Sequence, residues 1–211
     1  GARFDDRVTG RLDEFASKAK VIHIDIDPTS IAKLVVADYP IVGDLKLTVE
    51  AMLEDADNYE INDFSNWVEL LKDYREKEPL RYIDTDDLIK PQWPIQRVGK
   101  ILGDNAIIST DVGQHQMWTA QFFPFSYPRQ WITSGGLGTM GFGLPAALGA
   151  ARAFKGTNRV VVNFTGDGSI LMNIQELMTC SEYELPVINI VLNNNYLGMV
   201  RQWQTMFYEN R

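Results

Sequence analysis

Two stretches, Val160-Val-Val-Asn-Phe-Thr-Gly-Asp-Gly-Ser169 and Val187-Ile-Asn-Ile-Val-Leu-Asn-Asn-Asn-Tyr196, decide the fold of this chain. Each begins with an apolar, β-branched run of the kind found in parallel strands that are buried on both faces. Each run then gives way to small polar residues, and the sequence between the two runs is long enough for one helix. The pair therefore predicts two parallel strands joined by a crossover helix.

The same alternation extends along the rest of the chain. We expect further strands at 21–27, 41–44, 106–110 and 131–133, and helices at 29–36, 45–53, 64–77, 94–102, 114–122, 141–154 and 170–184. Alternating strands and helices are typical of an α/β fold with a mostly parallel sheet. Polar and proline-containing sequence predicts a domain boundary within residues 56–91.

Composition narrows the kinds of partner. The net charge of −8 over 211 residues argues against nucleic acid or an anionic membrane surface as a ligand. No apolar run reaches the roughly 18 residues that span a bilayer. The single cysteine, Cys180, cannot form an internal disulfide, so we expect a reducing compartment and a packing role. The chain begins with Gly1 and ends after a helix-like stretch, so we expect an internal part of a longer protein.

The polar residues after the two decisive strands predict a magnesium site. Asp167 and Asn194 are 27 residues apart and follow consecutive strands, whose carboxyl ends meet at one edge of a parallel sheet. An Asp carboxylate, an Asn amide oxygen and a main-chain carbonyl near Tyr196 are oxygen ligands that Mg²⁺ accepts alongside phosphate oxygens. Gly168 and Ser169 would meet the phosphate. The alternative is two ordinary turns in which Asp167 and Asn194 cap helices.

These motifs resemble a known family. Gly-Asp-Gly at 166–168 followed by Asn-Asn at 193–194 resembles the metal-binding signature of thiamine diphosphate enzymes. Stretches at 1–10, 111–118, 134–145 and 197–203 are similar to acetolactate synthase in particular, and only 55–91 matches poorly. The resemblance implies an α/β fold in which residues 1–58 end a Rossmann-like, FAD-contacting central domain. It implies a linker at 59–91 and a parallel-sheet thiamine diphosphate-binding domain at 92–211, incomplete at its C-terminus.

The resemblance also implies a role for each matching position. Met140 would bend the cofactor, Gly138 would present its backbone to the aminopyrimidine, and Met199 and Trp203 would line the substrate channel. The plainer alternatives are that His115 is a buried histidine whose hydrogen bonds are already made, and that Met199 and Trp203 are core residues on one face of a helix. Thiamine diphosphate contacts are implied at Gln114, His115, Gly138, Thr139, Met140, Asp167, Gly168, Ser169, Asn194 and Met199, and FAD contacts at Arg3, Phe4, Asp5, Asp25, Ile26, Asp44 and Leu45.

The implied activity depends on thiamine diphosphate, Mg²⁺ and FAD, although the flavin has no net redox task. Pyruvate is decarboxylated and condensed with pyruvate or 2-ketobutyrate, early in valine, leucine and isoleucine synthesis. The activating glutamate is expected in the N-terminal domain of a partner subunit, so we expect no catalytic residue here and no turnover by this chain alone. The family implies a homodimer or homotetramer with the active site at the subunit interface, a possible regulatory subunit, and a cytoplasmic or, in a plant or alga, plastid location.

Two other enzyme classes stay open from the sequence. One is another thiamine diphosphate enzyme of the pyruvate decarboxylase or oxidase type. The other is a nicotinamide-dependent dehydrogenase, because Gly136, Gly138 and Gly141 satisfy the spacing G-x-G-x-x-G before a helix. The acid that binds the ribose should follow about 20 residues later, but Asp167 lies 31 residues beyond Gly136. The spacing therefore favours the metal site over the dinucleotide site.

Overall fold

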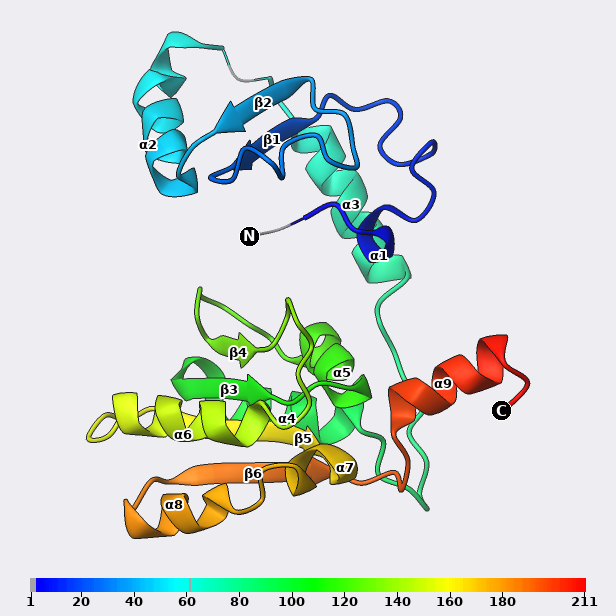
Figure 1. Cartoon of the computed structure of the whole chain (residues 1–211), viewed down its shortest axis with the longest axis vertical. Coiled ribbons are helices and arrows are strands. Elements are labelled where there is room, and N and C mark those ends of the chain that lie inside the picture. Colours follow the sequence, from blue (N-terminus) through cyan, green and yellow to red (C-terminus); the bar gives the residue numbers. More distant parts are fainter. Residues whose placement is uncertain (1–2, 61) are drawn as a thin grey trace. The chain divides into compact units, whose positions relative to one another are not determined.

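The computed structural model describes residues 3–60 and 62–211, and the chain divides into two compact units, Gly1–Asp73 and Tyr74–Arg211 (Figure 1). In the first unit two consecutive strands are followed by helices. They are α1 (Asp6–Thr9), β1 (Ile22–Asp25), β2 (Tyr39–Val42), α2 (Leu45–Asp55), the 3₁₀ turn η1 (Ala56–Asn58) and α3 (Ser65–Lys77), which continues past the division.

The two strands of the first unit form a small parallel sheet. Its register runs from the pair Ile22–Tyr39 to the pair Asp25–Val42. Asp44 then caps α2 by accepting a hydrogen bond from the Leu47 N–H at 3.0 Å. The strand expected at 21–27 and the helices expected at 45–53 and 64–77 are confirmed. The second strand begins and ends two residues earlier than the expected 41–44.

The helix expected at 29–36 is wrong, because this segment forms turns. The Asp27 carboxylate accepts hydrogen bonds from both the main-chain N–H and the hydroxyl of Thr29, at 2.9 and 2.8 Å. Such a side-chain bond competes with helical hydrogen bonding. The residue Ala32 has a φ of 54°, which ends any right-handed helix there.

The second unit is a four-stranded, fully parallel sheet with the strand order β4-β3-β5-β6 (Figure 1). The register pairs Thr110 with Phe164 across β3 and β5, and Gly166 with Leu192 across β5 and β6. Its elements are α4 (Gln92–Leu102), η2 (Gly103–Asn105), β3 (Ala106–Thr110), α5 (Gln114–Phe122), β4 (Trp131–Thr133), α6 (Gly143–Ala153), β5 (Val160–Gly166), α7 (Asp167–Leu171), α8 (Glu176–Glu182), β6 (Val187–Leu192) and α9 (Gly198–Phe207). The strands expected here are confirmed.

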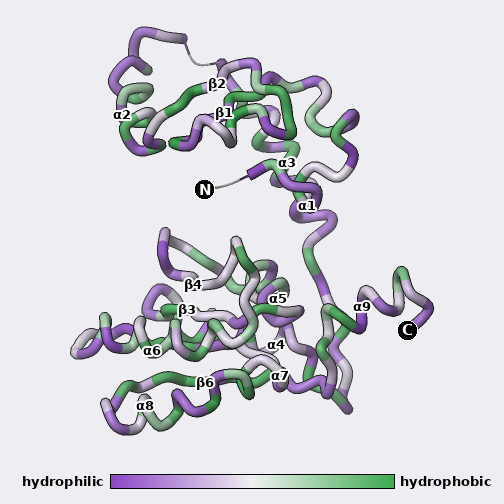
Figure 2. Tube along the Cα trace, in the orientation of Figure 1, coloured by the Kyte–Doolittle hydropathy of each residue, from purple (hydrophilic) through white to green (hydrophobic). Residues whose placement is uncertain are grey.

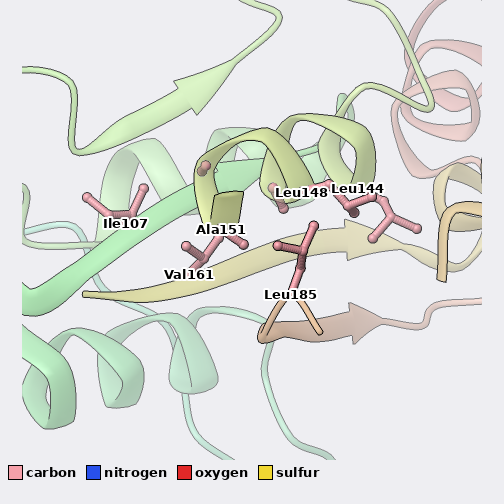
Figure 3. Close-up of a cluster of buried hydrophobic side chains, with 8 residues drawn as sticks. Ile107, Leu144, Leu148, Ala151, Val161 and Leu185 are labelled. Carbon is pink, nitrogen blue, oxygen red and sulfur yellow. The ribbon is translucent and has the colours of Figure 1, made fainter. Parts of the chain in front are cut away.

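Both faces of this sheet are covered, which is why its central strands, β3 and β5, each begin with a run of buried apolar residues. Ile107 and Val161 pack with the alanine-rich side of α6 and with Leu185 (Figure 3). The alternate residues Ile108 and Val162 pack on the opposite face with residues of α4 and the end of α5. Side chains that alternate between two buried faces leave little polar sequence within a strand. Figure 2 shows that β6, at the edge of the sheet, is also mostly hydrophobic.

The single helix expected at 170–184 is wrong in its extent. The structure has two short helices, α7 and α8, separated by tight turns in which the Glu176 N–H bonds to the Asn173 carbonyl at 3.0 Å. Asn173 also uses its side chain to reach the Gly141 carbonyl. This long-range contact interrupts a sequence whose local pattern favours one continuous helix.

Cys180 packs against the cluster beneath α6, and burial together with nearby Glu176 raises the pKa of its thiol. A raised pKa leaves the thiol protonated and unreactive, in agreement with a packing role. Within residues 3–60 and 62–211, none of the helices has the length and apolar content needed to cross a bilayer.

Candidate functional site

The turn after β5 and the loop after β6 lie against each other at the carboxyl edge of the sheet. The register places Gly166 opposite Leu192, so Asp167 and Asn193 each follow the end of one of two neighbouring strands. A methyl group added to Gly168 would lie only 2.8 Å from Leu197 Cδ2, so the two segments are in contact. The sequence predicted this meeting from the parallel order of the strands.

Gln114, at the start of α5, joins the same edge. A methyl group on Gly198 would overlap the Gln114 amide oxygen and would lie 2.9 Å from Asn194 Nδ2. Gln114 Nε2 also donates to Gln202 Oε1 at 3.1 Å. These contacts border a cavity of about 320 Å³, which is lined by Gln114, Asn194, Tyr196, Gly198, Arg201, Gln202, Thr205 and Met206.

His115 is buried beside this turn with an unused ring nitrogen. Its side chain lies close to two glycines: methyl groups would come within 2.7 Å of Cε1 at Gly113 and 3.2 Å of Nδ1 at Gly166. Only 6% of the residue is exposed, and among the described residues Nε2 has no hydrogen-bond partner. Burial lowers the pKa of His115, while the carboxylates of Asp111 and Asp167 act in the opposite direction. The imidazole is therefore neutral near pH 7, with Nε2 available to a ligand.

The oxygen donors at this edge suit a magnesium ion that is shared with a phosphate. Asp167 is half-buried and is the first residue of α7, whose cap is Gly166. Asn194 Oδ1 accepts a hydrogen bond from the Tyr196 N–H at 3.0 Å, and an amide oxygen can accept a second contact. Over the described part of the chain, no cluster of three or more His, Cys, Asp or Glu side chains could hold a metal. Mg²⁺ instead accepts one carboxylate and a few neutral oxygen atoms from the protein when the phosphate of a ligand supplies its remaining oxygen ligands.

Ser169 and Gly168, the remaining predicted phosphate contacts, lie in α7. The Ser169 hydroxyl is buried and donates to the Val112 carbonyl at 3.4 Å. Because α7 has only five residues, its macrodipole adds little attraction for an anion. Phosphate binding here would therefore depend on individual N–H groups rather than on a long helix.

The loop between β4 and α6 carries Gly138, Thr139 and Met140. Gly138 and Thr139 are exposed, Met140 is half-buried, and Gly138 has a φ of 74°. A methyl group on Gly138 would lie 3.9 Å from Val112 Cγ1, so the loop passes beside the end of β3. The structure thus brings this loop to the same strand end that precedes Gln114 and His115.

Asp111 is a feature of this edge that the sequence reasoning missed. Its buried carboxylate accepts hydrogen bonds from the N–H groups of Gly141 and Gly143, each at 2.9 Å. In a dinucleotide-binding turn, such N–H groups before the helix would face the pyrophosphate. Here a protein carboxylate already takes them and would repel a second anion, so the nicotinamide alternative is wrong. The position directly after β3 was the one signal in the sequence that could have identified Asp111.

Met199 and Trp203 both lie on α9, one helical turn apart. Met199 is half-buried, and Trp203 is 52% exposed, with its ring centroid 5.1 Å from that of Phe207. The lining of the cavity includes their neighbours Gln202 and Met206 instead. Arg201, which was not predicted, borders the cavity and lies over the Tyr196 ring at 3.7 Å. The substrate roles of Met199 and Trp203 stay predictions.

The first unit gathers some of the positions predicted to contact FAD. Asp25 ends β1 and Asp44 follows β2, so both lie at the carboxyl edge of the small sheet, next to the exposed side chains of Ile26 and Leu45. Phe4 packs edge-on against His23 of β1, with ring centroids 5.2 Å apart. The remaining two positions lie near α1, where Asp5 is the cap and pairs with Arg3 at 3.5 Å.

Two family models match successive parts of this chain. The family model described as the thiamine pyrophosphate enzyme C-terminal TPP binding domain matches residues 111–211. A second model, the thiamine pyrophosphate enzyme central domain, matches residues 1–52. The order of the two matches is the order that the sequence predicted.

Individual relatives identify the kind of enzyme more closely than the family models do. The chain is 50% identical to acetolactate synthase isozyme 3 large subunit of Escherichia coli, over 100% of this chain and 37% of that protein. It is 51% identical to acetolactate synthase 2, chloroplastic, of Brassica napus, over 99% of this chain and 32% of that protein. The chain thus spans about a third of the length of the curated relatives that it matches. It belongs to the thiamine pyrophosphate enzyme family and, within that family, to the acetolactate synthase group.

Proposed function

We propose that the protein containing this chain is a Mg²⁺- and thiamine diphosphate-dependent acetolactate synthase. It would decarboxylate pyruvate and join the remaining two-carbon unit to pyruvate or 2-ketobutyrate, which is a step towards branched-chain amino acids. The observation that supports this most is the meeting of the Asp167 turn, the Asn194 loop and the unpartnered His115 nitrogen at one sheet edge. The chain's 50% identity to an acetolactate synthase large subunit supports the same activity.

Each group at this edge has a proposed task. Asp167, Asn194 and a main-chain carbonyl near Tyr196 would hold Mg²⁺, which in turn would hold the diphosphate. His115 Nε2 would face the diphosphate, and Gln114, Gly168 and Ser169 would complete that end of the site. When bound, thiamine diphosphate supplies a nucleophilic carbon and an electron sink for the loss of CO₂.

The β4–α6 loop would receive the other end of the cofactor. Gly138 would offer its main chain to the aminopyrimidine, with Thr139 beside it, and Met140 would hold the cofactor in its bent form. Met199 and Trp203 would contribute from α9, towards the substrate. No catalytic acid or base is proposed in this chain, because the activating glutamate would come from another subunit.

The rest of the proposal concerns FAD, assembly and location. FAD would bind through Asp25, Ile26, Asp44 and Leu45 at the carboxyl edge of the small sheet, together with Arg3, Phe4 and Asp5. The enzyme would be a homodimer or homotetramer with its active site at the subunit interface, and a small regulatory subunit would bind it. It would be cytoplasmic in a bacterium and plastidial in a plant, as the name of the Brassica napus relative indicates for that protein.

Calorimetry on the full-length protein tests this function. We expect thiamine diphosphate to bind only in the presence of Mg²⁺, no heat from NADH, and acetolactate formation from pyruvate. Binding of thiamine diphosphate that does not depend on Mg²⁺, or the absence of acetolactate, would contradict the proposal. The 211-residue chain by itself should form no acetolactate, because the activating carboxylate is not part of it.

Trp203 provides a test of substrate choice. Replacing Trp203 by leucine should change the ratio of acetohydroxybutyrate to acetolactate by about tenfold when pyruvate and 2-ketobutyrate compete, because the shape of the acceptor pocket changes. Phe207→Leu is the matched control, since it removes the neighbouring ring one turn further along α9. Equal product ratios in the wild type and Trp203→Leu would remove Trp203 from the acceptor pocket.

A further inference from the structure

We propose that Asp111 is a positioning residue that fixes the Gly138–Met140 segment for the cofactor. The proposal rests on the function given above, and it assigns to Asp111 a task that needs no contact with the cofactor. Asp111 lies at the end of β3, whereas the segment lies in the loop between β4 and α6. The link between them is a set of hydrogen bonds to a buried charge.

The Asp111 carboxylate is bonded by main-chain N–H groups. Oδ1 accepts from Val112 at 2.8 Å and from Gly141 at 2.9 Å. Oδ2 accepts from Gly141 at 3.1 Å and from Gly143 at 2.9 Å. Only 1% of the residue is exposed. A buried carboxylate is tolerated when it is fully hydrogen-bonded, so the loop must keep these N–H groups in place for the charge to stay buried.

Gly141 is also held from its other side. Asn173 Nδ2 donates to the Gly141 carbonyl at 2.6 Å, from the turn that separates α7 and α8. Gly141 has a φ of 88°, and a methyl group there would lie 2.7 Å from Asn173 Nδ2. Both main-chain polar groups of Gly141 are therefore fixed by side chains distant in sequence. Met140 is the residue immediately before it.

The upstream end of the segment has its own attachment. The Gly138 N–H donates to the Ser134 carbonyl at 3.1 Å, and the Thr139 N–H donates to the Ser134 hydroxyl at 3.0 Å. Gly138 and Thr139 are exposed and Gly138 has no side chain, so a free segment would lose much conformational freedom on binding a ligand. Asp111 reduces that loss by fixing the downstream end beforehand. Preorganisation of this kind appears in an experiment as tighter binding and faster turnover.

The test uses Asp111→Asn in the full-length enzyme. The variant keeps the size of the side chain but replaces one acceptor oxygen with an NH₂ group, which would face an N–H of the loop. We expect the Kd of thiamine diphosphate at saturating Mg²⁺ to rise by about tenfold or more, because a buried N–H loses its partner. Amide hydrogens of residues 138–143 should also exchange faster, and Asp111→Glu should restore neither property, since its carboxylate is displaced.

Ser109→Ala is the matched control for general loss of stability. The buried Ser109 hydroxyl donates to the Gly143 carbonyl at 2.8 Å, so this variant also removes a buried hydrogen bond at Gly143 but leaves Gly141 and Met140 anchored. We expect a lower Tm and a Kd for thiamine diphosphate within about twofold of the wild type. An equal rise in Kd for both variants, or an unchanged Kd in Asp111→Asn, would overturn the proposal.

Two further measurements cover the remaining outcomes. If Asp111→Asn does not fold, Asn173→Ala removes the opposite anchor of Gly141, and an unchanged Kd in that variant would overturn the proposal. If the wild type binds no thiamine diphosphate, the proposed function fails. Hydrogen exchange of residues 138–143 then still tests the anchoring by Asp111, since equal exchange in the wild type and the variant would disprove it.

Discussion

Replacing Asp167 by alanine is expected to abolish Mg²⁺-dependent binding of thiamine diphosphate. Asp167 is the only carboxylate in the proposed ligand set, and its partners there are an amide and a main-chain carbonyl. Without this charge a hard cation that gives up water reluctantly has little reason to enter the site. Changes to groups around metal ligands already cost about 10–100-fold in affinity, so loss of the ligand itself should cost at least about 100-fold.

The measurement is calorimetric titration of the full-length protein with thiamine diphosphate at several Mg²⁺ concentrations. Asp167→Ala should give no heat at concentrations that saturate the wild type, and Asp167→Asn should bind weakly at high Mg²⁺, since it keeps an oxygen but loses the charge. Glu182→Ala is the control, because Glu182 is an exposed acid at the far end of α8. Wild-type affinity in Asp167→Ala would show that the metal lies elsewhere.

The sheet of the second unit could be predicted from the sequence because its central strands, β3 and β5, are buried on both faces. Mainly apolar, β-branched runs at 106–110, 160–164 and 187–192 match β3, β5 and β6 within two residues. The helices expected at 29–36 and 170–184 were wrong for a different reason. In each, a side-chain hydrogen bond, from Thr29 to Asp27 or from Asn173 to the Gly141 carbonyl, outweighs a local pattern that favours helix.

The candidate site was predictable only in part. Parallel strand order brings the residues after β5 and β6 together, so the placement of Asp167 beside the Asn194 loop follows from the sequence. Asp111 could not be given a role in this way, because its partners are main-chain N–H groups about 30 residues further along the chain. Main-chain partners leave no side-chain signature. Gly141, which supplies one of these groups, instead matched a dinucleotide motif.

A large loss of stability is expected when Gly143, where α6 meets the end of β3, is replaced by alanine. A methyl group on Gly143 would lie 2.6 Å from the Asp111 main-chain nitrogen and 2.7 Å from Asn163 Oδ1, and neither neighbour can move freely. Gly143→Ala should therefore push α6 away from the sheet and weaken the bonds of Gly143 to Ser109 and Asp111. We expect a loss of about 2–4 kcal/mol in the free energy of unfolding.

Gly149 in the same helix predicts a change of opposite sign. No atom lies within 4 Å of a methyl group added there, so Gly149→Ala should gain about 0.5–1 kcal/mol from helix propensity alone. Urea unfolding of both variants, followed by circular dichroism, separates close packing from propensity, and a stability gain in Gly143→Ala would show that the contact with β3 is absent. Because Gly143 and Asp111 share a hydrogen bond, the double variant Asp111→Asn with Gly143→Ala should lose less stability than the two single losses combined.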